Sequence, residues 1–429
     1  MEYKDSVFGM IPASWDIKRA SDIVEIVTDY VANGSFKSLA ENVTYNSNKD
    51  YAVLIRLKDY NANFNEKNFV YVDKKGYEFL KKSRLFGGEI IISNVGDVGT
   101  VFKCPHLNMP MTLGPNSITV KFKGCNDFYY YWMKSPIGHQ MLLSIVTGSA
   151  QPKFNKTNFK ELLFPVPPLP VQEQIASVLC NIDTLIESNE NKIKLLEEKI
   201  AADVSHYFPY YDDEDIDGWK KITLDDIAVF TNGYSYKGTE LDDNKETALV
   251  TIKNFERGGG FKLDGFKGIT PSSKAKKCHE VELFDTLVAH TDLTQKAEVI
   301  GKGEMLLSKS KYKKVIMSMD LVKVETKNNI SKFLLAGLLN DSKFKNHCLK
   351  YVNGSTVLHM SKNALPEYKL LFPESNEYIA KISSLLENSY RLLSNLIQTN
   401  IQLVDLRDSL LSKLMSGRID LSSIDDGDY

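Results

Sequence analysis

Two long stretches with an apolar residue at every third or fourth position dominate the hydrophobic pattern of this chain. They cover about residues 172–208 and 377–416, and their spacing predicts two long amphipathic helices. Stripes of this length with polar flanks are typical of a coiled-coil seam. The predicted seam positions are Ile175, Val178, Ile182, Leu185, Ile193, Leu196 and Ile200 in the first helix and Ile379, Ile382, Leu386, Leu393, Ile397 and Val404 in the second.

Asn189 interrupts the first stripe. In such a position an asparagine either fixes the register of the helix pair from a buried site or lies partly exposed. Since the second helix begins where the second globular stretch ends, a pair formed by the two helices must be antiparallel.

Shorter patterns fill the stretches before each long helix. Runs rich in β-branched residues and bounded by Gly, Asn and Asp predict strands at 51–57, 89–93, 118–122, 248–252, 286–289 and 315–319. Residues 128–143 and 331–349 each predict a helix packed on a sheet. The aromatic cluster 128–132 could stack on nucleic-acid bases, but its place within a helical pattern favours the core. The expected fold class is α+β, with two mixed α/β bodies in tandem, each followed by a long helix, the two helices pairing as an antiparallel coiled coil.

The two halves of the chain resemble each other. Trp15 and Trp219 are 204 residues apart, and the Ile-Ala pairs at 175–176 and 379–380 have the same offset. Residues 21–23, 53–60, 88–93 and 147–149 match 225–227, 248–255, 284–289 and 353–355 in order, whereas the stretches between them differ. This pattern indicates one scaffold carrying two different surfaces. We expect recognition domains at 1–167 and 209–373, helices at 168–208 and 374–418, and an acidic tail at 419–429.

Composition excludes several classes of protein. The chain has no apolar run long enough to span a membrane and no signal peptide, and its five scattered cysteines contain no CxxC pair, which favours a cytoplasmic setting. The net charge is −2, yet residues 1–167 carry +4, and the second body carries +7 once the acidic run 212–217 is set aside. Positive charge in the globular bodies suits phosphate contacts, although an ordinary lysine-rich surface would account for it equally.

Several motifs resemble those of the specificity subunit of type I restriction–modification enzymes. They are residues 11–15 (IPASW), 147–154 (TGSAQPKF), 164–176 (FPVPPLPVQEQIA) and 406–417 (LRDSLLSKLMSG). The resemblance covers nearly the whole chain. Two places depart from the pattern: residues 372–377 lack the proline-rich approach to the helix, and residues 359–361 lack the basic character that usually follows the Gly-Ser loop.

The resemblance implies a function in a bacterial or archaeal cytoplasm. Each globular body would read one half of a bipartite double-stranded DNA site. The helix pair would set the spacer between the halves and dock two methyltransferase subunits, which carry S-adenosylmethionine. Motor-nuclease restriction subunits would join the complex.

Motifs for catalysis by this chain itself are missing. There is no Asn/Asp-Pro-Pro-Tyr/Phe box of an adenine methyltransferase, no GxxxxGKS/T phosphate loop and no histidine pair at zinc-ligand spacing. We therefore expect a non-catalytic chain with no cofactor or metal of its own. The competing hypotheses are a coiled-coil protein scaffold without DNA specificity and, against the missing motifs, a fused restriction enzyme.

Candidate DNA contacts are polar and basic residues in the diverged loops, since such side chains bind base edges and phosphates. In the first body they are Asn33, Lys37, Lys58, Asn94, Ser149, Gln151 and Lys153. In the second they are Tyr234, Tyr236, Lys237, Lys253, Asn254, Arg257, His290, Ser355 and Thr356.

Overall fold

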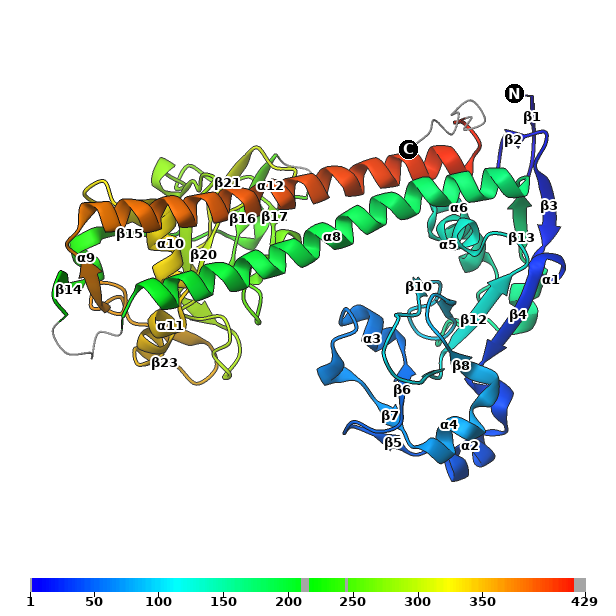
Figure 1. Cartoon of the computed structure of the whole chain (residues 1–429). Coiled ribbons are helices and arrows are strands. Elements are labelled where there is room, and N and C mark those ends of the chain that lie inside the picture. Colours follow the sequence, from blue (N-terminus) through cyan, green and yellow to red (C-terminus); the bar gives the residue numbers. More distant parts are fainter. Residues whose placement is uncertain (1, 210–215, 244–245, 420–429) are drawn as a thin grey trace. The chain divides into compact units, whose positions relative to one another are not determined.

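The computed structural model describes residues 2–209, 216–243 and 246–419 (Figure 1). The acidic residues at 212–215 and nearly all of the expected acidic tail lie outside the described residues. The chain divides into two compact units, the first formed by Met1–Thr184 and Val404–Tyr429 and the second by Leu185–Leu403. Each unit combines one α+β body with part of both long helices.

Two main sheets build the body of the first unit. One is antiparallel, in the order β10-β9-β12-β4, and the other has the order β5-β7-β6-β11-β8, with β6 and β11 parallel. A third pair, β13 with β3, leads into the first long helix. The strands are β1 Tyr3–Lys4, β2 Ile11–Pro12, β3 Asp16–Arg19, β4 Val24–Asp29, β5 Tyr45–Asn46, β6 Ala52–Ile55, β7 Tyr71–Val72, β8 Arg84–Leu85, β9 Ile90–Ser93, β10 Val101–Lys103, β11 Met111–Leu113, β12 Ser117–Phe122 and β13 Leu163–Val166.

The second unit repeats the central part of this topology, although its second sheet has three strands where that of the first unit has five. Its antiparallel sheet β20-β18-β22-β15 corresponds to β10-β9-β12-β4, the parallel pair β16 and β21 corresponds to β6 and β11, and β14 with β25 corresponds to β3 with β13. The repeat in the sequence is therefore a repeat of the fold. The strands are β14 Trp219–Thr223, β15 Ala228–Asn232, β16 Thr247–Val250, β17 Lys267–Gly268, β18 Thr286–Ala289, β19 Thr291–Asp292, β20 Gly303–Met305, β21 Lys314–Met317, β22 Leu321–Thr326, β23 Val352–Asn353, β24 Leu358–Met360 and β25 Lys369–Pro373.

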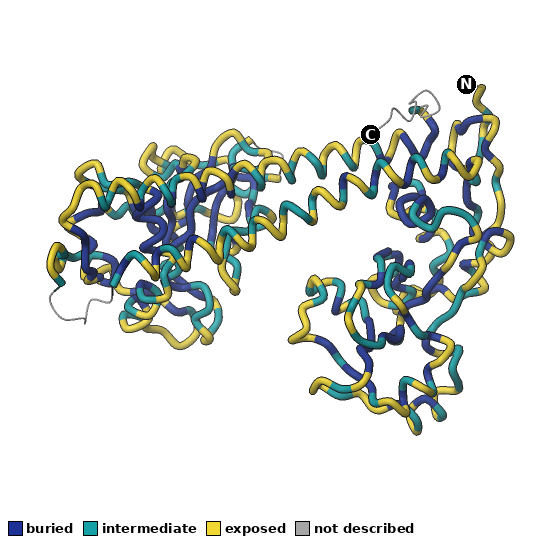
Figure 2. The backbone as a smooth tube through the Cα atoms, viewed as in Figure 1, coloured by how far each residue is buried: buried dark blue, intermediate teal, exposed yellow. Residues whose placement is uncertain are grey.

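The antiparallel sheet of each unit lies between two cores, which explains why its central strand is apolar without interruption. In β9, Ile90 and Ile92 pack in the core that contains the long helices, and Ile91 packs in the core shared with the other sheet. In β18, Val288 packs in the core that contains the long helices, and Leu287 packs in the core shared with the other sheet. Successive side chains of a strand point to opposite faces, so a strand covered on both faces carries no polar alternation. Figure 2 shows these strands as buried. All six predicted strands are present.

The predicted helices at 128–143 and 331–349 are wrong in one respect, because each is two helices. The first breaks between α5 Asn126–Lys134 and α6 Pro136–Ser144, and the second between α10 Lys332–Asn340 and α11 Ser342–Leu349. Pro136 disfavours the helical conformation in the residue before it, Ser135. The Ser135 side chain then caps α6 by accepting from the Gly138 N–H. Asp341 caps α11 by accepting from the Lys343 N–H. The aromatic cluster 128–132 is core, as predicted, with no residue more than 8% exposed.

The other short helices of the bodies are peripheral to the sheets. In the first unit they are α1 Ala20–Ile23, α2 Phe36–Asn42, α3 Leu57–Asn61, α4 Lys74–Phe79 and α7 Lys156–Glu161, with 3-10 turns η1 Tyr30–Asn33, η2 Glu66–Asn68 and η3 Lys81–Ser83. In the second they are α9 Leu224–Ile227 and the 3-10 turns η4 Gly238–Glu240, η5 Ile252–Asn254, η6 Leu263–Gly265 and η7 Lys277–His279.

The two long helices are α8 Leu169–Tyr207 and α12 Asn376–Met415, close to the predicted bounds. In the first unit, Leu411 and Leu414 of α12 share a core with Ile175 and Leu179 of α8. In the second unit, Asn189 of α8 is bonded to Asn400 of α12, while Tyr207 contacts Tyr378, so the helices run antiparallel.

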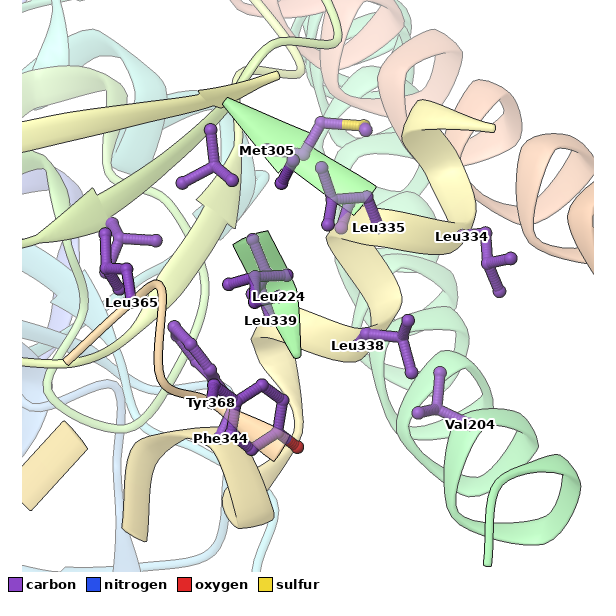
Figure 3. Packing of buried hydrophobic residues seen from close by; sticks show 14 of the residues in the cluster. Val204, Leu224, Met305, Leu334, Leu335, Leu338, Leu339, Phe344, Leu365 and Tyr368 are labelled. Atoms are coloured by element: carbon purple, nitrogen blue, oxygen red, sulfur yellow. The ribbon is translucent and has the colours of Figure 1, made fainter. Parts of the chain in front are cut away.

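The seam positions differ in exposure along the helices. Leu185 is 54% exposed; the buried positions are Ile175, Ile182, Ile200, Ile382, Leu386 and Leu393, and the half-buried ones are Val178, Ile193, Leu196, Ile379, Ile397 and Val404. Several of these residues pack on the adjacent body as well as on the partner helix. Figure 3 shows Val204 of α8 facing Leu338 of α10 in the core of the second unit. A Cβ on Gly337 of α10 would lie 2.9 Å from a methyl group of Val204, so the absence of a side chain there permits the close approach.

Candidate nucleic-acid interface

The candidate interface is built from two loops that meet at the same edge of the antiparallel sheet in each unit. In the first unit, Lys153 pairs by β-bridges with Val95, just after β9, and with Thr147 of the Gly-Ser loop. In the second unit, His359 of β24 pairs with Thr291, just after β18, and with Asn353 of the second Gly-Ser loop. Lys153 and His359 thus occupy equivalent positions on the shared scaffold. The first position is basic and the second is not, which agrees with the departure seen in the sequence.

Asn94 holds the two loops of the first unit together. Its side-chain Nδ2 donates to the Phe154 carbonyl oxygen at 2.9 Å, and its backbone carbonyl oxygen accepts from the Phe154 N–H at 3.1 Å. The side chains of Ser149, Gln151 and Lys153 are exposed on the loop beyond it. The structure therefore brings these four predicted residues together. Donors and acceptors on one exposed loop can reach base edges and phosphates of a duplex.

In the second unit a buried carboxylate organises the corresponding loop. Asp292 accepts from the Thr294 N–H at 2.8 Å and from the Val299 N–H at 2.7 Å, along with the hydroxyl of Thr294. Burial alone would raise the pKa of Asp292, but these hydrogen bonds outweigh it and hold the pKa below its usual value. A carboxylate bonded to several N–H groups fixes the path of the loop. Asp292 thereby sets the position of the chain that follows His290.

His290 is half-buried beside β24. Burial lowers its pKa, and nearby His359 and Lys362 lower it further, while Asp320 opposes them. The ring therefore favours the neutral form, in which one nitrogen donates and the other accepts. Ser355 and Thr356 are exposed on the Gly-Ser loop, and the Ser355 carbonyl accepts from Gln295 Nε2 at 2.9 Å. These three predicted residues lie on the two loops that meet at this edge.

Arg257 belongs to a separate glycine-rich turn of the second unit. Its side chain is 70% exposed, and its Nε lies 3.5 Å from a carboxylate oxygen of Glu298. Lys302 Nζ donates to the carbonyl oxygens of Glu256 and Arg257 and so stabilises the turn. Arg257 is free to exchange a surface ion pair for another partner, since exposed ion pairs contribute little.

Three predicted residues already use their polar groups within the protein. Asn254 is fully buried, where its side chain caps η5 and donates to the Lys262 carbonyl oxygen. Tyr234 is buried and bonded through its hydroxyl to Glu240 and Ser272. Asn33 is half-buried and links η1 to η3 through Tyr30, Lys82 and Ser83. In this structure these side chains support loops.

The remaining candidates lie on other loops and helices. Lys37 is exposed on α2 and Lys58 on α3. Lys237 and Lys253 are exposed on turns of the second unit, and Tyr236 packs half-buried beside Tyr234. The structure does not gather these residues at the loops that contain Lys153 and His359.

A hollow in the first unit contains residues that the sequence patterns missed. It lies beside Asn94 and is lined by residues from η1, α2 and the start of β12, among them Phe36, Tyr45 and Ser117. Phe36 is 82% exposed, an unusual position for a phenylalanine on a short polar helix. In the sequence, the local signal of this hollow was the apolar face that Phe36, Leu39 and Ala40 form on a short helix.

The described part of the chain holds no cluster of three or more His, Cys, Asp and Glu side chains placed to bind a metal ion. Across residues 2–209, 216–243 and 246–419, no helix is both long and apolar enough to cross a bilayer.

This chain is similar to known proteins of one class. Residues 12–198 match the family described as type I restriction modification DNA specificity domain. The type I restriction enzyme MjaIX specificity subunit of Methanocaldococcus jannaschii is 23% identical over 451 residues, which cover 97% of this chain and 96% of that protein. Residues 12–198 therefore carry a type I restriction modification DNA specificity domain, and the chain as a whole is similar to type I restriction–modification specificity subunits.

A second sequence relative and a solved structure are also similar to this chain. The putative type I restriction enzyme MjaX specificity subunit of the same organism is 25% identical over 210 residues, 45% of each chain. The crystal structure of the S subunit of a type I restriction–modification system from M. genitalium has the same fold. Its TM-score is 0.54 at 17% identity, and the match covers 93% of this chain and 96% of that one.

Proposed function

We propose that this chain is the DNA-recognition subunit of a type I restriction–modification complex, in which each globular body reads one half of a bipartite site. The proposal rests on one observation: the two units share an antiparallel sheet and the β-bridges at its end, but the loops there carry different residues. The same β-bridges place Lys153 in one unit and His359 in the other. One scaffold used twice with different contact chemistry is suited to two different half-sites.

The long helices would serve two purposes in such a complex. Together they would set the spacer between the half-sites, and their exposed faces would dock two methyltransferase subunits. We assign the recognition domains to residues 1–167 and 209–373 and the spacer helices to 168–208 and 374–418, as the sequence indicates. The chain itself would be non-catalytic and act in the cytoplasm. S-adenosylmethionine would bind to the methyltransferase subunits, and restriction subunits would join to cleave DNA.

The candidate contacts divide by exposure. We propose that Ser149, Gln151, Lys153, Lys37 and Lys58 bind the first half-site together with Asn94. Arg257, His290, Ser355, Thr356, Lys237, Lys253 and Tyr236 would serve the second. Tyr234, Asn254 and Asn33 would act indirectly, by holding the loops in place.

Salt dependence of DNA binding tests this proposal. The chain would be purified together with its methyltransferase subunits and titrated with genomic fragments at increasing salt. Since bound lysines and arginines release phosphate counterions, the logarithm of the affinity should fall linearly with the logarithm of the salt concentration. Binding of the methyltransferase subunits without binding of DNA at any salt concentration would support the protein-scaffold alternative and reject the proposal.

A further inference from the structure

The hollow beside Asn94 in the first unit has the dimensions of a ligand site. Its volume is about 480 Å³, within the ~300–1,000 Å³ common among small-molecule sites. Leu39 and Val43 form a buried apolar floor, and Phe36 and Tyr45 stand exposed at the mouth. Phe36 is the first residue of α2, and within the first unit α2 lies at the end of the body that is far from α8 (Figure 1). We call this feature the Ser117 hollow.

Two polar side chains in the wall of the Ser117 hollow have an oxygen without a partner. Ser117 Oγ and Asn94 Oδ1 are both closed to solvent, and neither has a hydrogen-bond partner among the residues that the structure describes. Ser117 is only 2% exposed. Buried polar atoms are nearly always bonded, and leaving one unbonded costs stability. Two such atoms in the wall of one hollow indicate that a partner comes from outside the chain.

The second unit supplies an internal control for this interpretation. Ser117 lies opposite Ser93 in the pairing of β12 with β9, and Leu321 lies opposite Ala289 at the same place in β22 and β18. Leu321 is fully buried. The scaffold therefore accepts an apolar residue where the first unit carries serine, so the fold alone does not require a hydroxyl at Ser117.

The chemistry of the Ser117 hollow fits a nucleobase. Aromatic rings at the mouth offer faces on which a base can stack, and such stacking tolerates any base. An amide oxygen accepts from an exocyclic amino group, and a serine hydroxyl, which turns about a single bond, can donate or accept beside it. Lys37 follows Phe36 in α2, and Lys153 pairs with Val95, so both exposed lysines are neighbours of residues that line the hollow and would be available to the adjoining phosphates.

We propose that the Ser117 hollow receives one base of the first half-site, turned out of the duplex and carrying an exocyclic amino group. The proposal rests on the function proposed above. On entry of the base, side chains at the mouth would move aside and uncover the two closed oxygens. Asn94 Oδ1 would then accept from the amino group, Ser117 would bond to the ring edge, and Phe36 would stack on the base. Base-extruding proteins combine these two elements, hydrogen bonds to the base edge and stacking on aromatic or apolar side chains.

Fluorescence of 2-aminopurine in the intact complex tests the proposal. Once the methylated motif is known, 2-aminopurine would replace each base of both half-sites in turn, apart from the methylated adenines, in duplexes bound to the chain with its methyltransferase subunits. We expect a several-fold rise in fluorescence at one position of one half-site. Phe36→Ala and Ser117→Ala should abolish that rise and weaken binding of this half-site about tenfold. The matched control is Phe86→Ala, since Phe86 is 76% exposed in the same unit but does not line the hollow.

The outcomes separate this inference from the proposed function. Tight, sequence-selective binding with no fluorescent position, or a rise that Phe36→Ala leaves unchanged, would overturn the base site and leave the DNA-recognition function standing. Absence of DNA binding would reject both. Saturation of the DNA-free complex by free adenosine or cytidine monophosphate, without any fluorescent position in the duplex, would instead assign the hollow to a free nucleotide. Thermal unfolding of Ser117→Ala should show no loss of stability, because the variant removes an unbonded buried hydroxyl.

Discussion

At the scale of single residues, equivalent positions in the two units carry different chemistry. Lys153 corresponds to His359, Ser117 to Leu321 and Asn94 to His290, as the shared strand pairings show. Each exchange changes charge or hydrogen-bonding capacity while the backbone pairing stays the same. Recognition would therefore be decided by side chains at the sheet edge, and substitutions there should act on one half-site at a time.

Arg257→Ala should change selectivity at one half-site only. The side chain is exposed and pairs with Glu298 at 3.5 Å, so it can turn to a guanine edge. Loss of a bidentate base contact costs about 1–3 kcal/mol of discrimination. The measurement is the affinity of the complex for duplexes that vary at each position of the motif, with Lys313→Ala, another exposed cation of this unit, as the control. An equal loss on every sequence would make Arg257 a phosphate contact instead.

Glu304 should make the stability of the second unit depend on pH. Burial raises the pKa of its carboxyl from 4.5 to about 7, against a hydrogen bond from the Gly260 N–H that lowers it. The folded state binds this proton more tightly than the unfolded state does. Protonated Glu304 therefore contributes fully to the free energy of unfolding below pH 4.5, and this contribution is lost as the pH rises through about 7.

Glu304→Gln removes this titration and should reveal its size. The difference in unfolding free energy between variant and wild type should grow in favour of the variant by about 3 kcal/mol between about pH 4.5 and pH 8. Denaturant unfolding at several pH values measures it. A constant difference across this range would show that Glu304 ionises like an exposed carboxylate.

At the scale of helices and strands, the sequence predicts what depends on periodicity and misses what depends on local competition. The spacing of apolar residues predicts the strands and the long helices α8 and α12, because burial of one face of an element requires apolar residues at regular intervals. The breaks at Ser135 and Asp341 were missed because the apolar pattern continues across them. A capping side chain marks each break, and Pro136 adds a second signal at the first one only. Such single-residue signals leave the apolar periodicity unchanged.

The candidate interface was predictable only in part. The Gly-Ser loops are marked by their residues, but the Ser117 hollow joins segments near residues 30, 45, 94 and 117 that only the tertiary fold brings together. Asn33 and Asn254 illustrate a second limit. A loop asparagine that caps a turn and one that binds a base need the same amide, and burial alone separates them.

The Asn189–Asn400 pair should fix the register of α8 and α12. Asn189 Nδ2 donates to Asn400 Oδ1 at 2.8 Å, and Asn400 Nδ2 donates to the Ile186 carbonyl oxygen at 3.3 Å. Polar pairs in helix seams reduce stability but specify one alignment. Asn400→Leu alone should lower the unfolding free energy by about 1–3 kcal/mol, since it leaves a half-buried amide unbonded. The double variant Asn189→Leu with Asn400→Leu should recover or exceed the stability of the wild type.

A thermodynamic cycle of thermal unfolding on the two single variants and the double variant measures this coupling. Losses that simply add in the double variant would show that the two amides do not interact. If register and spacer are linked as proposed, the double variant, although stable, should also methylate sites with altered spacers.

At the scale of the whole molecule, one chain carries two units of the same topology, and each includes part of both long helices. The two units share the antiparallel sheet and the parallel strand pair, and they differ in the loops at the end of that sheet and in the size of the second sheet. If each unit reads DNA by itself, the recognised sequence must contain two independent half-sites. Changes in the loops of the first unit should alter one half of that sequence and leave the other intact.

A methylation map of the host genome tests this requirement most directly. The map would be recorded with the wild-type chain, without it, and with a variant whose residues 147–154 are replaced by 353–360. We predict that methyladenine disappears from a single bipartite motif without the chain, and that the variant changes or abolishes recognition of one half only. Unchanged methylation in the absence of the chain, or loss of a continuous motif without two halves, would contradict the account.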